Sequence, residues 1–176
     1  MHLKQMGFVC VLVSVWLSVF GLTVTCEGAE DATSCETRVS ALRRVPVFQR
    51  LDKEALRKVA QVAELVERQD GDRIIEQGKR TRKMAIALDS EVRILIHGKP
   101  IRVLPPNSLV GEIEFLEDVP ASADVVLMGK SRIILLEYKR FQDVMDADPG
   151  LGYRVMFEIA RMEANRLRTN TQGQSK

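Results

Sequence analysis

The spacing of apolar residues constrains this chain most, because it changes twice between residues 33 and 168. Residues 33–44 and 52–63 place apolar side chains three and four positions apart, as on one face of a helix. From Glu64 to Leu136 the period falls to two, in short runs separated by turn residues. Helical spacing returns from Phe141. The pattern predicts an α+β domain in which an antiparallel β-rich middle lies between helices.

Individual residues set the expected boundaries of these elements. Thr33-Ser34 and Asp52 are expected to cap two N-terminal helices, with Pro46 interrupting the chain between them. Asp70-Gly71 predicts a tight turn between the first strands. A short helix is expected over residues 141–148, followed after Pro149-Gly150 by a longer one over residues 151–168. Many short strands with regular turns indicate a sandwich or barrel.

The first 26 residues differ from the remainder. Residues 7–25 carry no charged side chain; Lys4 precedes them and acidic residues follow from Glu27. This order favours an N-inside segment and an extracytoplasmic remainder, so we expect a periplasmic or secreted domain. A cleaved signal peptide, a retained membrane anchor over residues 7–25 and lipidation at Cys26 all stay open. A Cys26–Cys35 disulfide is a further hypothesis for an oxidising compartment.

We therefore divide the chain into four parts. Residues 1–26 are the signal or anchor, 27–44 an N-terminal helix and linker, 45–168 the folded domain and 169–176 a disordered tail. The formal net charge is +2, and it falls to +1 without the first 26 residues because Lys4 is their only charged side chain. A nearly neutral domain of this kind gives no basis for nucleic-acid binding.

The most specific motif is LVGEIEFLEDVPASADVV, over residues 109–126. It resembles the phosphate-binding cassette of cyclic nucleotide-binding domains, whose pattern is approximately F-G-E-x-A-L-x-x-x-x-P-R-x-A-T-V. The resemblance extends over residues 45–165, from the apolar connector at residues 47–51 to Phe141 at the start of the helix that follows the roll. It implies an antiparallel β-roll, or jelly roll, flanked by N- and C-terminal helices.

The resemblance also implies a candidate site for a cyclic nucleotide, with no other cofactor. In that family the glycine lets the backbone approach the ligand, the glutamate accepts from the ribose 2′-hydroxyl and an arginine pairs with the cyclic phosphate. Here the glycine and glutamate are present, but Ala121 stands where the arginine is expected. The candidate site residues are Gly111, Glu112, Ile113, Ala121, Ser122 and Ala123.

Other substitutions in the cassette bear on the ligand. Glu114 and Asp124 replace residues that are small or hydroxylated in the family, and we expect their charges to oppose a phosphate. Arg102 or Arg132 could substitute for the missing guanidinium, although the spacing favours neither. Without the arginine, Glu112 fits two roles equally, a ribose ligand or a carboxylate that caps the following turn.

The sequence gives no positive evidence for an enzyme. It contains no G-x-S-x-G, P-loop or GxGxxG motif and no metal-ligand spacing, so we expect neither catalytic residues nor a metal. Two functions remain. One is a sensor or regulatory module that holds a nucleotide-like ligand. The other is a degenerate domain that acts through protein–protein contacts, either with an unknown partner or as a homodimer through residues 151–168.

Overall fold

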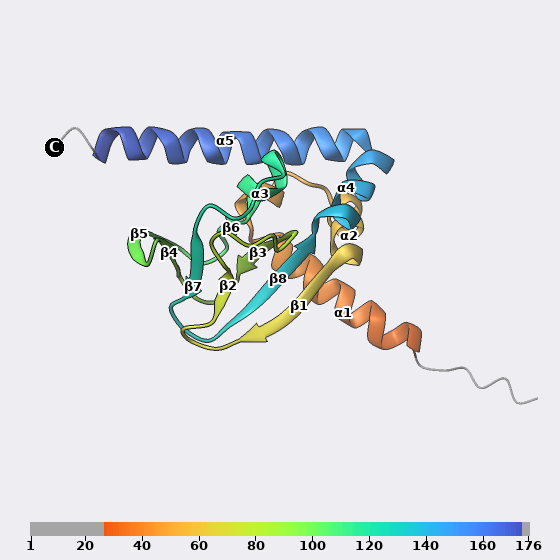
Figure 1. Ribbon diagram of the computed structural model, residues 1–176. Coiled ribbons are helices and arrows are strands. Elements are labelled where there is room, and N and C mark those ends of the chain that lie inside the picture. The colour runs from red at the N-terminus through yellow and green to blue at the C-terminus, as the bar shows by residue number, and fades with distance from the viewer. Residues whose placement is uncertain (1–26, 174–176) are drawn as a thin grey trace, which may run out of the picture.

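The computed structural model describes residues 27–173, so the predicted signal or anchor at residues 1–26 lies outside the described residues. Within that range the chain is helical at both ends and β-rich in the middle, as the apolar spacing predicts (Figure 1). The helices before the strands are α1 (Glu27–Leu42), the short η1 (Pro46–Phe48) and α2 (Lys53–Val62). Those after the strands are α4 (Tyr138–Ala147) and α5 (Pro149–Gly173).

The described strands form two four-stranded antiparallel sheets. The first has the order β1 (Ala63–Arg68), β8 (Ser131–Glu137), β3 (Lys83–Ala87) and β6 (Leu109–Val110). The second has the order β2 (Arg73–Ile75), β7 (Asp124–Leu127), β4 (Val92–Ile96) and β5 (Lys99–Leu104). The first and last strands pair along their whole length, from Ala63↔Leu136 to Arg68↔Ser131, and this pairing joins the two ends of the roll. The predicted β-roll is confirmed.

Strand β3 shows how alternation builds two cores. Met84 and Ile86 belong to the core between the first sheet and the helices, whereas Ala85 and Ala87 belong to the core between the sheets. Successive side chains of a strand point to opposite faces, so one strand serves both cores. This explains why β3 reads as a nearly continuous apolar run.

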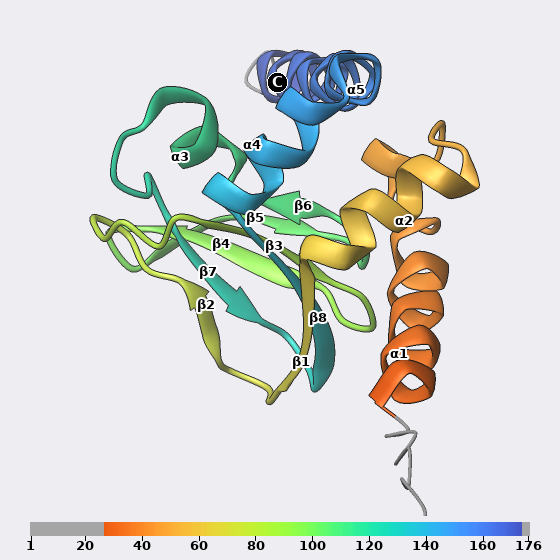
Figure 2. The same cartoon turned by 90° about the vertical axis from the view of Figure 1, so that its right-hand side faces the viewer.

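The helices cover the first sheet, and Figure 2 shows α1 and α2 beside β1 and β8. Helix α2 begins as expected, with the Asp52 carboxylate accepting from the Ala55 amide at 2.9 Å. The rings of Phe48 and Phe141 meet edge to face, with centroids 6.3 Å apart. On α5, Val155 and Ile159 are buried in the same core, so this helix face covers the roll.

Three expected boundaries differ from the structure. Helix α1 begins at Glu27, before the predicted Thr33-Ser34 cap. Helix α5 continues to Gly173, so residues 169–173 are helical and not a disordered tail. No proline or glycine interrupts the chain between Arg168 and that final glycine, and the helix therefore propagates. Helix α4 begins at Tyr138, three residues before the predicted start, because Glu137 caps it by accepting from the Lys139 and Arg140 amides.

Among the described residues, no helix combines the length and the apolar character that crossing a membrane requires. Cys35, half-buried on α1, is the only cysteine among the described residues and forms no disulfide within them. Since Cys26 lies outside the described residues, the Cys26–Cys35 disulfide stays a prediction.

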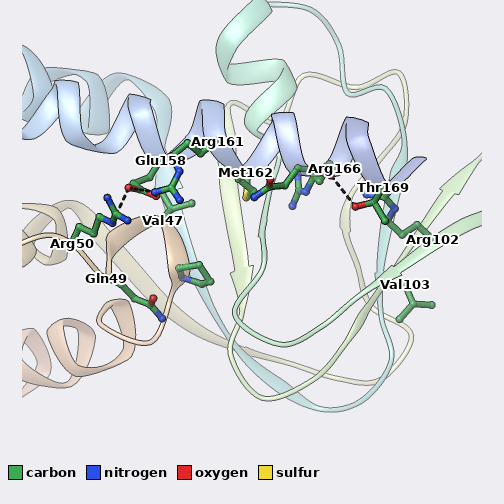
Figure 3. Close-up of a pocket in the computed structure, with 12 residues that line it drawn as sticks. Val47, Gln49, Arg50, Arg102, Val103, Glu158, Arg161, Met162, Arg166 and Thr169 are labelled. Atoms are coloured by element: carbon green, nitrogen blue, oxygen red, sulfur yellow. Dashed lines mark hydrogen bonds and ion pairs between the residues drawn. The ribbon is translucent and has the colours of Figure 1, made fainter. Parts of the chain in front are cut away.

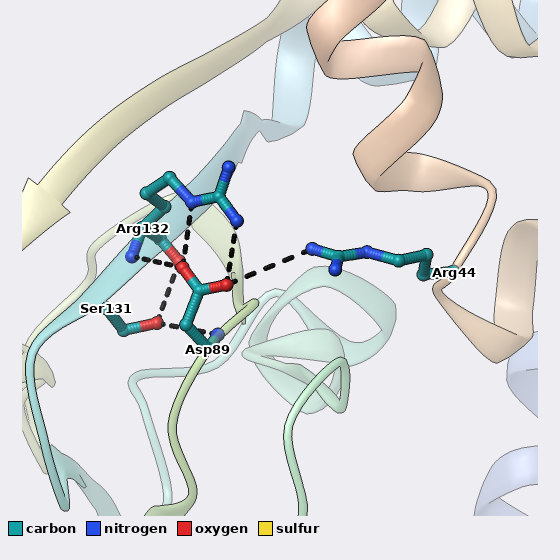
Figure 4. Close-up of polar contacts among 4 residues, drawn as sticks. All are labelled: Arg44, Asp89, Ser131 and Arg132. Carbon is teal, nitrogen blue, oxygen red and sulfur yellow. Dashed lines mark hydrogen bonds and ion pairs between the residues drawn. The ribbon is translucent and has the colours of Figure 1, made fainter.

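A polar cluster ties the turn after β3 to β8 and to the end of the N-terminal helices (Figure 4). The Asp89 carboxylate accepts from the Nε and Nη2 of Arg132, both at 2.8 Å, and lies 4.0 Å from Arg44 Nη2. The Ser131 hydroxyl accepts from the Asp89 amide at 3.0 Å. Hydrogen bonds from Arg132 lower the pKa of Asp89 to about 2. Arg132 is therefore committed to Asp89, which excludes it as the substitute for the cassette arginine.

Candidate ligand-binding site

The cassette begins with a turn that needs glycine. Gly111 has a φ of 86° and precedes helix α3 (Glu112–Glu117). A Cβ there would lie 3.0 Å from both Ile75 Cδ1 and the Lys83 carbonyl oxygen. The Tyr138 hydroxyl donates to the Gly111 carbonyl at 2.8 Å. Glycine is thus required at residue 111 by the backbone conformation and by the close packing around it, and this turn sets the start of α3.

A cavity of about 310 Å³ lies beside this turn, beneath α5. All six predicted site residues line it, so the structure brings together both ends of the cassette. The further lining side chains are mostly aliphatic and come from β2, β4, β5, β6 and β7, namely Ile75, Ile94, Ile96, Ile101, Leu104, Val110 and Val125. Charged side chains also line the cavity. Helix α5 contributes Glu163 and Arg166, together with the apolar Leu167.

Glu112 is the central polar group of the cavity. It is 4% exposed, and its Oε1 accepts from Arg166 Nη1 at 2.5 Å. The same guanidinium donates to the Leu109 carbonyl at 2.6 Å and to Glu163 at 2.7 Å, so it fastens α5 to the cassette. Figure 1 shows α5 running above α3 across the roll. Glu112 Oε2 has no hydrogen-bond partner among the described residues.

The protonation of Glu112 follows from its burial. Burial raises the pKa of Glu112 to about 7, against the opposing attraction of Arg166. A carboxyl group with this pKa exchanges its proton near neutral pH. It can therefore accept hydrogen bonds from a ligand when ionised, or donate one when protonated.

The cassette at residues 109–126 contains no arginine, and Ala121 stands where the family has one. Ala121 is 7% exposed, and its main chain is paired, accepting from the Gly78 amide at 2.8 Å and donating to the Lys79 carbonyl at 2.9 Å. Of the two arginines considered as substitutes, Arg102 lines the cavity and Arg132 does not. Arg102 makes no ion pair with the residues that the structure describes.

The two additional carboxylates also have structural roles, and their effect on a phosphate stays a prediction. Glu114 is 3% exposed and accepts from the Thr81 hydroxyl at 2.9 Å and the Arg82 amide at 3.0 Å. Asp124 accepts from the Gln77 amide at 2.8 Å and does not line the cavity. Both carboxylates hold the segment between β2 and β3 against the cassette.

Sequence reasoning missed Arg166. Its distance from Glu112 in the chain gives no hint of contact, because only the path of α5 over α3 brings them together. The one available signal is local: Glu163 and Arg166 are three residues apart and therefore share a helix face. With Arg166 included, the charged residues lining the cavity are Glu112, Glu114, Glu163, Arg102 and Arg166.

Comparison with known proteins agrees with this architecture. Residues 65–148 match the family model described as the cyclic nucleotide-binding domain. Among solved structures, a regulatory subunit of a cAMP-independent protein kinase A from Trypanosoma brucei, a triple mutant bound to cAMP in its A site, has a TM-score of 0.70 at 23% identity. That match covers 86% of this chain and 54% of the other.

Two further structures share the fold. The corresponding subunit from Trypanosoma cruzi, bound to guanosine, has a TM-score of 0.56 at 22% identity, covering 64% of this chain and 41% of that one. A cyclic nucleotide-binding domain from Methylobacillus flagellatus has a TM-score of 0.67 at 15% identity, covering 78% and 80%. This chain thus spans about half the length, or less, of the kinase subunits. Residues 65–148 thus match the cyclic nucleotide-binding domain, and the described chain folds into the β-roll of that domain.

Proposed function

We propose that this module is a sensor for a neutral nucleoside, and that it is not an enzyme. One observation carries the proposal: a buried carboxylate oxygen, Glu112 Oε2, has no partner among the described residues and lines a mostly aliphatic cavity that has no cation at residue 121. A nucleoside supplies the matching groups, since its ribose hydroxyls donate hydrogen bonds and its base is flat and largely apolar on its faces.

The ribose would bind at Glu112 without breaking the contact with α5. Arg166 uses Oε1, so Oε2 is left to accept from a hydroxyl. An unmade hydrogen bond on a buried polar atom costs about 1–3 kcal/mol, and a ligand hydroxyl removes this cost. The aliphatic side chains of Ile75, Ile94 and Val125 would contact the base.

A cyclic phosphate fits the same cavity poorly. Losing a charge-assisted contact costs about 1.5–3 kcal/mol, which is roughly a tenfold to hundredfold loss of affinity. Of the two arginines that line the cavity, Arg166 is already bound by Glu112 and Glu163. Arg102 is the remaining cation, and it lies on β5, outside the cassette.

Two of the similar structures support this preference. The Trypanosoma cruzi subunit binds guanosine, so this fold can hold a nucleoside without a phosphate. The Trypanosoma brucei subunit was crystallised with cAMP as a mutant, and one of its substitutions introduces an arginine. Both observations concern those proteins, and they give the choice of ligands to test here.

Isothermal titration of the full chain in a neutral detergent would test the proposal, with guanosine, adenosine, cAMP and cGMP as ligands. We expect saturable binding of at least one nucleoside and binding of its cyclic monophosphate that is about tenfold weaker or more. Glu112→Gln should abolish nucleoside binding. Flat traces for both nucleosides would refute the proposal, as would a cyclic nucleotide that binds more tightly than its nucleoside.

A substitution can supply the missing charge. Ala121→Arg should raise the affinity for cAMP by about tenfold, because the new guanidinium would line the cavity at the phosphate end. Val119→Arg is the matched control: it adds the same charge to the same loop at a residue that does not line the cavity. Equal gains in both variants would show that long-range charge, not a contact, is responsible. No gain in Ala121→Arg, with the variant still folded, would show that the cavity rejects a phosphate for other reasons.

A second candidate function is homodimerisation through α5. Five residues on its exposed side follow a four-three spacing, namely Tyr153, Phe157, Ala160, Ala164 and Leu167. This is the spacing of a coiled-coil seam, and the two alanines allow close approach of a second helix. Tyr153 and Phe157 are 70% and 49% exposed, and their rings stack with centroids 6.0 Å apart.

Sedimentation of the full chain would test the dimer. Ala164→Asp should convert it to a monomer, because the charge would be buried in the seam. Asn165→Asp, exposed on the same helix but off the seam, should leave the dimer intact. A monomer at every concentration for the unaltered chain would refute this candidate.

We further propose that the domain is exported, and is either released or held at the membrane by residues 7–25. The proposal rests on the uncharged stretch between Lys4 and Glu27. Cell fractionation and the mass of the mature N-terminus would test it. A full-length chain recovered wholly in the cytoplasmic fraction would refute it.

A further inference from the structure

A second hollow lies on the other side of α5 from the seam. This hollow, which we call the arginine groove, has a volume of about 700 Å³. Its walls are α5, the connector around η1 and strand β5. It shares only Arg102 and Arg166 with the cavity of the roll.

One partly buried acid holds two of the arginines in place. Glu158, whose side chain is 13% exposed, pairs with Arg50 Nε at 3.2 Å and with Arg161 Nη1 at 3.1 Å. Each guanidinium has five N–H donors, so both keep donors that Glu158 does not use. Arg102 makes no ion pair with the residues that the structure describes. A fourth arginine of the groove, Arg166, is paired with Glu112 and Glu163. The other three arginines share one glutamate, so the groove has an excess of positive charge.

The arginines are spread along the groove and do not converge on one point. Figure 3 shows Arg50 beside Glu158 at one end of the row along α5, and Arg102 near Thr169 at the other. From Glu158 to Thr169 the helix rises roughly 16 Å at 1.5 Å per residue. That length matches about five residues of extended chain at 3.3 Å per residue. The apolar side chains of Val47, Met162 and Val103 also line the groove.

We propose that the arginine groove binds an extended segment of a partner protein, about five residues long, with an acidic residue at each end and apolar residues between them. One acid would pair with Arg50 and Arg161, and the other with Arg102. A compact phosphate would reach only one end of the groove. The partner is therefore identified by charge complementarity and by the length of the groove.

This inference does not depend on the proposed nucleoside. Arg50 and Arg161 line only the groove, so substitutions there separate the two sites. A chain that binds the peptide but no nucleoside would refute the proposed function alone. A chain that binds the nucleoside but no peptide would refute the groove alone.

Fluorescence anisotropy on the full chain in a neutral detergent tests the groove. The probe is a labelled peptide of sequence Glu-Val-Ala-Val-Glu, and the control peptide is Gln-Val-Ala-Val-Gln. We expect saturable binding of the acidic probe only, weakening as the salt rises from about 0.05 M to about 0.5 M. Arg161→Gln and Arg102→Gln should each reduce affinity about fivefold or more, whereas Arg168→Gln, exposed on the same helix outside the groove, should change it less than about twofold.

Three results would overturn the proposal. The first is no saturable binding of the acidic peptide up to about 1 mM, and the second is equal binding of the glutamine peptide. The third is displacement of the peptide by inorganic pyrophosphate at concentrations below the dissociation constant of the peptide, which would identify a small-anion site. Urea unfolding of Arg161→Gln beside the unaltered chain serves as the folding control.

Discussion

The buried carboxyl group of Glu112 predicts an unusual dependence of stability on pH. Its pKa in the folded chain is about 7, raised from 4.5 by burial. Between these two values the folded state holds a proton that the unfolded state has released. The contribution of Glu112 to folding stability is therefore complete below about pH 4.5 and is lost as the pH rises to about 7.

The size of this effect follows from the two pKa values. At about 1.4 kcal/mol per pH unit, a rise of the pKa from 4.5 to about 7 corresponds to a loss of about 3–4 kcal/mol of stability. No discount for solvent is needed, because Glu112 is only 4% exposed. Glu112→Gln keeps the shape of the side chain and cannot titrate, so it should remove this loss.

Urea unfolding of both proteins at pH 5 and pH 7.5 is the assay. We expect the unaltered chain to be less stable at the higher pH by about 2–3 kcal/mol, and Glu112→Gln to differ by less than about 1 kcal/mol between the two. His97 is exposed and present in both proteins, so it cancels in the comparison. A variant that keeps the full dependence on pH would refute the assignment to Glu112, and an unaltered chain whose stability rises with pH would refute the sign.

Three further substitutions test other parts of the fold. Asp89→Asn should lower the free energy of unfolding at neutral pH by about 1 kcal/mol, after allowance for solvent screening. The difference between the two proteins should vanish as the pH falls to about 2, because a carboxylate with a lowered pKa stabilises the fold only while it is ionised. Acid titration of both proteins would show this. Gly111→Ala should lower the free energy of unfolding in urea by about 2–3 kcal/mol. Gly78→Ala is the control and should cost about 1 kcal/mol, because Gly78 also has a positive φ but an added Cβ would meet nothing within 4 Å. Equal losses would refute the close-packing argument. Ile159→Asp should unfold the domain because the side chain is 1% exposed, whereas Arg168→Asp, exposed on the same helix and off the seam, should change the free energy of unfolding by less than about 0.5 kcal/mol. A folded Ile159→Asp would refute the assigned helix face.

Local sequence patterns predict the part of the site that the cassette supplies. Gly111, Glu112 and Ala121 are close in the chain, and their residue types alone indicated a turn, a carboxylate and a missing guanidinium. The structure places all three around one cavity. The sequence could not separate the two roles of Glu112, because the answer depends on which atoms surround its carboxylate. Its pairing with Arg166 belongs to a contact between elements 54 positions apart.

The carboxylates of Glu114 and Asp124 show the same limit. Their charge is evident in the sequence, but its effect depends on which groups the carboxylates face. Both accept hydrogen bonds from the segment between β2 and β3. The arginine groove is a further example, since Arg50, Arg102 and Arg161 come from three separate elements.

The sequence by itself determined the class of fold, because the period of apolar residues, the caps and the turn glycines act over a few positions and each specifies a local conformation. It also determined that the cassette lacks its arginine. Only the tertiary structure decided that Arg166 lies on Glu112, that Arg132 is held by Asp89 and that Arg102 reaches the cavity. The physical reason is that long charged side chains find their partners across elements, according to how the helices and sheets pack, and no local pattern encodes that packing.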